Sequence, residues 1–174
     1  MDKKELRSII KSLKKQHTPD DLSRQSAIIC QKLEQHPDFA NAKRVMLYNA
    51  LPDEVQTADL IARWRGLKTI VLPTVVGDDI IPVALDSDTG FAVGDFNILE
   101  PQNKPYEGGF DLIVVPGVVF DPQGNRMGRG KGYYDRFLVK YPKVKKIGIC
   151  FDFQLVESIP AEPHDIGMDE VISY

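Results

Sequence analysis

Four short apolar runs constrain the fold of this chain more than any other feature. They occupy residues 44–50, 68–76, 111–120 and 145–151. None of them alternates strictly between apolar and polar residues, as a strand with one face in water does. Nearly continuous apolar runs are typical of strands that are covered on both faces, as in a parallel sheet. We therefore expect these four runs to form a buried, mostly parallel sheet.

Helical patterns precede these runs and lie between them. An amphipathic helix is predicted over residues 2–16, because apolar residues recur there at helical spacing: Leu6, Ile9, Ile10 and Leu13. A second helix is predicted from an N-cap at Thr18, with Pro19 in the first turn, to residues 36–37. A third begins after an N-cap at Thr57 and stops at Gly66, and a fourth covers residues 132–142 and is ended by Pro142. Alternating strands and helices indicate a layered α/β domain. Residues 80–102 are expected to hold a further strand and loops, and residues 169–174 a closing strand.

The overall charge argues against a dedicated nucleic-acid binder. The 174 residues fit a single domain over residues 1–174, and they carry a net charge of −3 with a pI of about 5.6. Proteins that bind nucleic acid usually have a basic balance. The two cysteines, Cys30 and Cys150, lack metal-ligand spacing, so we expect reduced, buried thiols. Without a signal peptide or a long apolar segment, the expected location is the cytoplasm, away from any membrane.

Residues 121–138, DPQGNRMGRGKGYYDRFL, combine glycines with cations and open a predicted helix. Backbone N–H groups at a helix N-terminus bind anions, and glycines let the backbone approach a ligand closely. Nucleotide phosphates meet these requirements. The stretch is neither a Walker A loop nor a GxGxxG motif. Two alternatives remain at this point: a flexible surface turn, and an RNA-binding loop in which Tyr133 and Tyr134 stack on bases.

Several stretches resemble the 5-formyltetrahydrofolate cyclo-ligase family, also called 5,10-methenyltetrahydrofolate synthetases. The most specific is the stretch DLIVVPGVVFDPQGNRMGRGKGYYDRFL at residues 111–138, which contains the signature-like NRMGRGKGYYDRFL at 125–138. Three further stretches support it: KKELR at 3–7, YNALPDEVQT at 48–57 and PAEPHDIGMDEVI at 160–172. The resemblance implies a three-layer α/β/α fold with a mostly parallel sheet, similar to NagB, RpiA and CoA transferases. It also implies ATP-dependent closure of 5-formyltetrahydrofolate to 5,10-methenyltetrahydrofolate, with Mg²⁺ as cofactor. We expect a monomer whose partners are these two small substrates. The rivals are a catalytically silent RNA-binding relative and a different nucleotide-dependent ligase.

The resemblance also assigns residues to the nucleotide. The implied ATP-binding set is Lys3, Lys4, Glu5, Leu6, Arg7, Arg126, Met127, Gly128, Arg129, Gly130, Lys131, Gly132, Tyr133 and Tyr134. Within it, Lys131 and Arg129 have the catalytic role of meeting charge on the transferred phosphoryl group. Lys3 and Arg7 are four positions apart, hence on one helix face. The alternative for both is a solvated basic face shared with Lys4, Lys11 and Lys14.

The remaining implied sites concern folate and metal. The implied substrate set is Asn49, Glu54, Arg129, Gly130, Lys131, Gly132 and Tyr133, with Glu54 holding the pterin ring. Glu54 has an alternative as a helix N-terminal acid near Thr57, a place that Asp53 can also fill. Asp135 and Asp165 are the implied magnesium ligands, and Asp169 competes with Asp165. The three histidines, His17, His36 and His164, are expected at the surface, without metal-ligand spacing.

Overall fold

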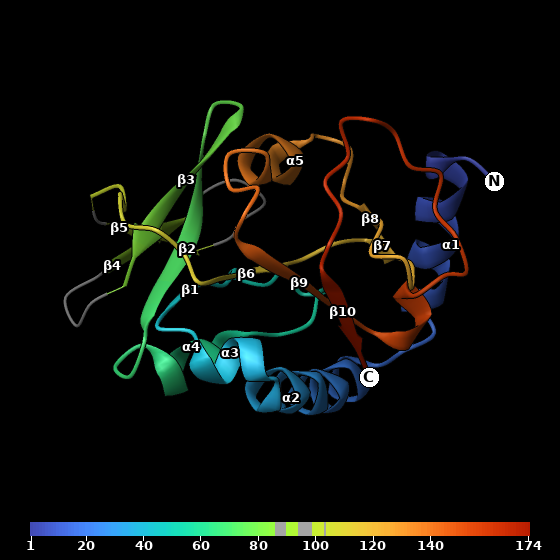
Figure 1. Cartoon of the computed structure of the whole chain (residues 1–174). Coiled ribbons are helices and arrows are strands. Elements are labelled where there is room, and N and C mark those ends of the chain that lie inside the picture. Colours follow the sequence, from blue (N-terminus) through green and yellow to red (C-terminus); the bar gives the residue numbers. More distant parts are fainter. Residues whose placement is uncertain (86–89, 94–98, 103) are drawn as a thin grey trace.

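A six-stranded sheet forms the middle layer of the protein (Figure 1). The structure is a computed structural model that describes residues 1–85, 90–93, 99–102 and 104–174. The strands of this sheet, in spatial order, are β10 (Glu170–Ser173), β9 (Lys145–Cys150), β6 (Leu112–Val115), β1 (Arg44–Met46), β2 (Thr69–Val76) and β3 (Asp79–Ala84). All neighbours pair in parallel except β2 and β3, which form an antiparallel hairpin at one edge. The predicted mostly parallel sheet is confirmed.

Residues along each strand point alternately to the two faces of the sheet, and both faces are buried. Val45 of β1 belongs to the apolar cluster on one face, whereas Met46 belongs to the cluster on the other. Val114 and Val115 of β6 divide in the same way, and all of these side chains are fully buried. The continuous apolar runs in the sequence therefore reflect helices on both sides of the sheet.

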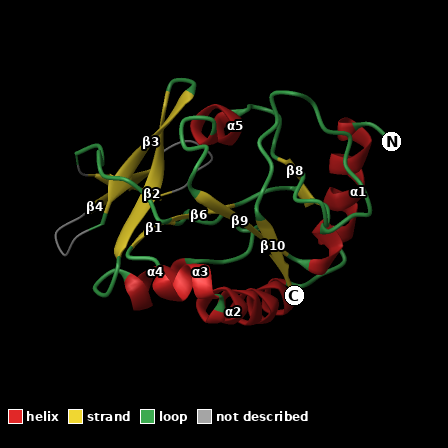
Figure 2. Cartoon of the chain, viewed as in Figure 1, coloured by secondary structure: helices red, strands yellow, loops and turns green. Residues whose placement is uncertain are grey.

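Helices form the two outer layers (Figures 1 and 2). The helices are α1 (Lys3–Lys14), α2 (Pro19–Gln35), α3 (Pro37–Asn41), α4 (Ala58–Trp64) and α5 (Tyr133–Leu138), with a short 3₁₀ turn at Asp152–Gln154. The second, third and fourth helices cover one face of the sheet, and α5 covers the other. At the end of the sheet, α1 packs through Leu6 and Ile10 against a small hairpin. The flanking helices confirm the predicted α/β class.

The N-terminus of α1 is fixed by a capping box. The Asp2 carboxylate accepts a hydrogen bond from the Glu5 amide at 2.8 Å, and the Glu5 carboxylate accepts one from the Asp2 amide at 2.9 Å. Two otherwise unsatisfied amides are thereby paired. The helix therefore starts at Lys3, which determines where the side chains of its first turns lie.

The run at residues 111–120 forms two strands rather than one. Pro116 and Gly117 interrupt it, because proline has no amide to continue the ladder. Two residues beyond them, β7 (Val119–Phe120) pairs antiparallel with β8 (Arg126–Met127). A further pair, β4 (Gly90–Val93) and β5 (Leu99–Gln102), lies in the stretch expected to hold a strand and loops. The rest of that expectation falls partly on residues 86–89 and 94–98, outside the described residues.

Some local details differ from the predictions. Thr57 stands at the N-cap position of α4, but its hydroxyl donates to the Tyr48 carbonyl and makes no cap. The helix after the glycine loop ends at Leu138, four residues before the expected stop at Pro142. The short helix α3 was not predicted; the His36 ring accepts the Asp38 amide at its start. His36, expected at the surface, is partly buried, and its ring bonds the exposed Glu170 of β10 at 2.5 Å.

Both cysteines are free and buried, as predicted. Burial raises the pKa of Cys30 to about 11 and that of Cys150 to about 12, so both thiols stay protonated at neutral pH. Among the described residues, none of the helices combines the length and apolar character that crossing a membrane requires.

Candidate active site

A cavity of about 760 Å³ opens at the carboxyl edge of the parallel sheet. The segments that follow β1 and β6 contribute Asn49 and Pro116 to its wall, and the edge hairpin contributes Val75 and Ile80. Ligand pockets typically measure roughly 300–1,000 Å³, and in open α/β sheets they lie beyond the carboxyl ends of the strands. The glycine-rich loop, where the sequence predicts a ligand, lines this cavity.

The glycine-rich loop forms the centre of the cavity wall. Gly128, Gly130 and Gly132 all line it, and the last two have φ angles of +99° and +70°. Side chains other than glycine rarely adopt such angles. Gly124, outside the cavity, has φ +89°, and a Cβ there would stand 2.3 Å from the Met168 carbonyl oxygen. Glycines therefore set both the shape of the loop and its close contact with the C-terminal segment.

Asp121 organises the turn that leads into this loop, and the sequence analysis did not identify it. Its fully buried carboxylate accepts hydrogen bonds from the amides of Gln123, Asn125 and Ile159 and from the Asn125 side chain, all between 2.9 and 3.0 Å. The signal for it in the sequence is the DPQGN pattern, since Asp before Pro and Gly favours an Asx-type turn.

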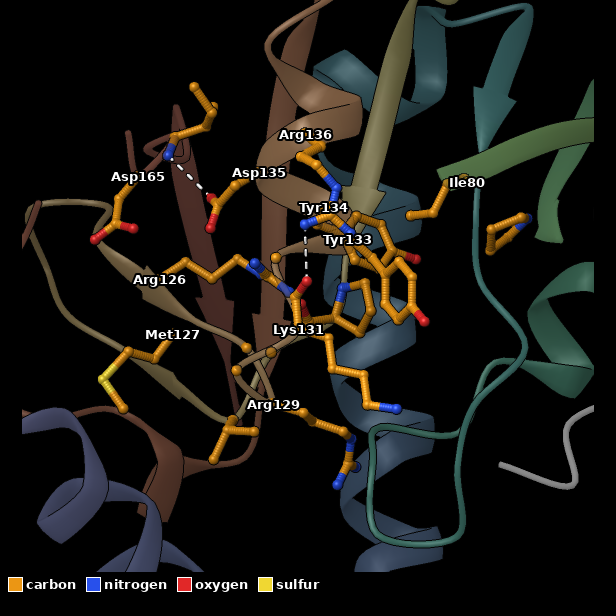
Figure 3. A pocket seen from close by; sticks show the side chains of 18 of the residues that line it. Ile80, Arg126, Met127, Arg129, Lys131, Tyr133, Tyr134, Asp135, Arg136 and Asp165 are labelled. Atoms are coloured by element: carbon orange, nitrogen blue, oxygen red, sulfur yellow. Dashed lines mark hydrogen bonds between the residues drawn. The ribbon is translucent and has the colours of Figure 1, made fainter. Parts of the chain in front are cut away.

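The three loop cations have different environments. Arg126 is buried under the cavity: its Nε donates to the Pro116 carbonyl at 2.7 Å, and its guanidinium lies 5.0 Å from the centre of the Tyr134 ring. Burial lowers the pKa of this guanidinium below its usual value. Arg129 forms an ion pair with Asp53 at 2.9 Å. Lys131 is exposed and extends beside Arg129 from the loop (Figure 3).

The first helix brings two of its five predicted residues to the cavity. Lys3 and Arg7 line it, and the Arg7 Nε donates to the Gly128 carbonyl at 2.9 Å. Lys4 is exposed away from the cavity, Glu5 belongs to the capping box and Leu6 is packed in the core. Residues three or four apart on a helix share a face, whereas consecutive residues point in different directions, so the five residues predicted here could not all face the cavity.

Two carboxylates, Asp135 and Asp165, gather at one side of the cavity (Figure 3). Asp135 accepts the Ile166 amide at 3.1 Å, which brings α5 next to the C-terminal segment. The Asp165 carboxylate accepts hydrogen bonds from the Lys3 ammonium at 2.8 Å and from the Glu162 amide at 2.9 Å. Burial alone would raise the pKa of Asp165, but these bonds and the Lys3 charge outweigh it and lower the pKa.

The competing carboxylate, Asp169, lies elsewhere. It accepts the Lys146 amide at 2.8 Å and lines a separate hollow near the end of α5. His164 is exposed, as expected; it lies at the rim of the cavity and contacts Glu162 at 3.1 Å. His17 stacks on Phe153, so it also packs against the protein.

Glu54 is the buried acid of the cavity. It is only 9% exposed, and its Oε1 accepts the Leu51 amide at 2.8 Å. Burial raises the pKa of Glu54, while this bond and the Arg129 charge oppose the shift. Asn49 and Tyr133, two further residues of the predicted substrate set, line the same cavity. The neighbouring Asp53 instead joins Arg129 to Lys14 of α1, with 3.0 Å between its Oδ2 and the lysine Nζ.

Fold and site together are those of an α/β protein that binds a phosphorylated ligand beside a second ligand. A glycine loop with cations, two carboxylates that suit a hard divalent cation and a buried acid share one cavity at the carboxyl edge of an α/β sheet. Such a combination is suited to a phosphorylated substrate and its metal beside a second, hydrogen-bonding ligand.

Comparison with known proteins identifies the family. The family model of the 5-formyltetrahydrofolate cyclo-ligases matches residues 1–174. The 5-formyltetrahydrofolate cyclo-ligase of Mus musculus is 32% identical over 187 residues, which cover 98% of this chain and 92% of the mouse protein. That of Mycolicibacterium smegmatis is 42% identical over 144 residues, 76% of this chain and 74% of that protein.

Solved structures agree with this result. A 5,10-methenyltetrahydrofolate synthetase from Mycoplasma pneumoniae superposes with a TM-score of 0.80 at 28% identity and covers 99% of this chain and 98% of its own. One from Aquifex aeolicus gives a TM-score of 0.83 at 35% identity, with 99% and 90% covered. The chain belongs to the 5-formyltetrahydrofolate cyclo-ligase family. The family resemblance seen in the sequence is thereby confirmed.

Proposed function

We propose that this chain catalyses the ATP-dependent closure of 5-formyltetrahydrofolate to 5,10-methenyltetrahydrofolate, releasing ADP and phosphate. One observation carries the proposal: a single cavity combines the cationic glycine loop, the buried Glu54 and the carboxylates Asp135 and Asp165. The named activity of the mouse and other relatives supports it.

The chemistry explains why ATP is needed. The formyl oxygen is a poor leaving group, so the N-10 nitrogen cannot expel it directly. Transfer of the γ-phosphoryl group to that oxygen, with ADP leaving, gives an iminium phosphate. N-10 then attacks the formyl carbon and loses its proton, and the carbon–oxygen electron pair leaves with phosphate. The protein has little covalent chemistry to perform, so positioning and charge stabilisation dominate.

The loop and α1 form the nucleotide side of the proposed site. The amides of the glycine loop and the cations Lys3, Arg7, Arg129 and Lys131 surround the cavity at that side. Arg126 lies beneath them as a buried positive charge that cannot move far, because its Nε is bound to Pro116. Lys131 and Arg129 have the catalytic role of meeting the charge on the transferred phosphoryl group. Tyr134 supports Arg126, and Lys4, Glu5 and Leu6 are left out of the proposal.

Glu54 forms the folate side of the proposed site. As a carboxylate it accepts hydrogen bonds from adjacent N–H donors of the pterin ring. Glu54 and the nearby Asn49 and Tyr133 line the same cavity as the loop. The 9% exposure of Glu54 implies that a ligand binds it in a largely water-free environment, where such bonds are strong.

Asp135 and Asp165 are the proposed ligands of Mg²⁺. They fit this ion because they are carboxylates on adjoining segments of one cavity, and magnesium usually binds through one or two carboxylates plus phosphate oxygens. The ion would neutralise the phosphate oxygens during transfer. Lys3 bonds Asp165, which keeps that carboxylate ionised.

The RNA-binding alternative receives less support. Tyr134 packs against the core with Arg126 over its ring, so the ring is not presented for base stacking.

The remaining proposals are that the enzyme acts as a monomer in the cytoplasm, where two buried free thiols remain reduced.

The test is incubation with 5-formyltetrahydrofolate, ATP and Mg²⁺ while the absorbance of methenyltetrahydrofolate is followed. We expect product only when all three are present, and ADP in equal amount. Circular dichroism checks that the protein is folded. Folded protein without product would refute the proposal, and RNA binding by the same sample would favour the rival.

A further inference from the structure

Arg136, on α5, is exposed, yet its guanidinium bonds both the glycine loop and the turn between β2 and β3. Its Nη1 donates to the Lys131 carbonyl at 2.8 Å, drawn in Figure 3. Its Nε and Nη2 both donate to the Asp78 carbonyl, at 3.1 and 2.5 Å. The guanidinium carbon lies 5.4 Å from the centre of the Tyr133 ring. One planar group therefore uses three donors and one face at the same time.

These contacts join two segments that are far apart in the sequence. Lys131 is in the glycine loop, and Asp78 is in the turn between β2 and β3, next to Gly77 with φ +62°. The two strands of that hairpin supply Val75 and Ile80 to the cavity wall. Arg136 thus connects the loop to the hairpin that forms another part of the cavity wall.

The residue between Lys131 and the helix fits this arrangement. A Cβ on Gly132 would stand 2.8 Å from the Arg136 Nη1, so a larger residue would displace the guanidinium. Glycine at this position is needed both for its left-handed angle of +70° and for the approach of Arg136.

We propose that Arg136 is a positioning residue: it fixes the Lys131 end of the loop against the β2–β3 turn, and thereby fixes where the Lys131 ammonium stands during phosphoryl transfer. The inference rests on the proposed function. It assigns Arg136 no contact with the reacting atoms, because its three hydrogen bonds go to main-chain carbonyls of the protein. A misplacement of about 1 Å can cost about 100-fold in rate, so holding the backbone of Lys131 matters as much as its charge.

Two variants test the role. Arg136→Gln removes the fork and the charge, and Arg136→Lys keeps the charge but cannot donate to both carbonyls as a planar fork. Lys140→Gln, just beyond α5, is the control for loss of an exposed positive charge. We expect both Arg136 variants to lower kcat by about 10- to 100-fold with little change in the folate KM. The control should behave like wild type. A normal kcat in both Arg136 variants would overturn the inference and leave the proposed function intact.

A double-mutant cycle separates positioning from independent effects. If Arg136 acts through Lys131, then Arg136→Gln should have almost no further effect on kcat in a Lys131→Ala protein. If the reductions in kcat caused by the two substitutions multiply in the double variant, Arg136 acts independently of Lys131, which would contradict the proposal.

Hydrogen exchange supplies a readout that needs no turnover. In Arg136→Gln we expect faster amide exchange at residues 129–133 and 77–79, with unchanged exchange in β6 and β9. The melting temperature should stay close to that of wild type. Unchanged exchange in the loop and the turn would overturn the inference. If the wild-type protein forms no methenyltetrahydrofolate, the proposed function fails. Amide hydrogen exchange, together with binding of a non-hydrolysable ATP analogue, still decides whether Arg136 holds the loop.

Discussion

Replacing Glu54 by glutamine separates what this acid contributes to ligand binding from what it costs the folded protein. The amide has nearly the same size, and its oxygen can still accept the Leu51 amide that now bonds the carboxylate at 2.8 Å. Packing around residue 54 should therefore change little. What is lost is the negative charge in a site that is only 9% exposed.

The binding effect follows from the hydrogen bonds that a pterin ring would make. Bonds to a charged acceptor are worth roughly 1.5–3 kcal/mol each, so losing one corresponds to a folate dissociation constant raised about 10- to 150-fold. Affinity for an ATP analogue should stay near normal, because the glycine loop keeps its cations. Titration calorimetry with each ligand measures both values. Equal losses for the two ligands, or normal folate binding, would refute the role of Glu54.

The stability effect has the opposite sign. Burial raises the pKa of Glu54, so the folded protein holds the ionised form less favourably than the unfolded chain does. That penalty is present above the raised pKa and disappears below the unfolded pKa of about 4.3. Glu54→Gln should therefore stabilise the ligand-free protein at pH 7 and leave it unchanged at pH 4. Urea unfolding at the two pH values checks this, and equal destabilisation at both would contradict it. Folate affinity of the wild type should fall as the pH drops through the raised pKa.

The other two predictions concern phosphate and metal. Lys131→Ala should lower kcat by about 100- to 1,000-fold while the ATP-analogue dissociation constant changes little, as expected for a cation that meets charge in the transition state. Steady-state kinetics with a normal kcat and only a raised ATP KM would reduce Lys131 to a binding residue. Asp135→Asn should raise the Mg²⁺ concentration for half-maximal rate at saturating ATP, with a melting temperature close to that of wild type. An unmoved magnesium curve would leave Asp165 as the sole proposed protein ligand.

The layers of the fold were predictable because they depend on local patterns. Continuous apolar runs indicated strands with two buried faces, and the spacing of Leu6 and Ile10 indicated the buried side of α1. Pro116 was visible in the sequence, yet its effect was missed: it divides one apolar run into β6 and the β7–β8 hairpin. One helix end was imprecise, since α5 ends at Leu138 and not at Pro142. The Thr57 position was right, but its hydroxyl donates to the Tyr48 carbonyl, which only tertiary contact brings near.

The site was predictable in its residue types and less so in its pairings. A glycine loop that follows a strand and precedes a helix predicts an anion-binding site at the end of that strand. Nothing local indicates that Asp53 holds Arg129 and Lys14, or that Arg136 bonds the carbonyl of Asp78. These contacts join residues between 39 and 76 positions apart and depend on how the loops meet above the sheet.

The most direct test of the account follows the formyl oxygen. The proposed reaction transfers the γ-phosphoryl group to this oxygen, which then leaves with phosphate. Substrate labelled with oxygen-18 in the formyl group is incubated with the protein, ATP and Mg²⁺, and the released phosphate is analysed by mass spectrometry. The account predicts one labelled oxygen in each phosphate, formed in step with methenyltetrahydrofolate. Product with unlabelled phosphate would contradict it, because the formyl oxygen would then have left by another route.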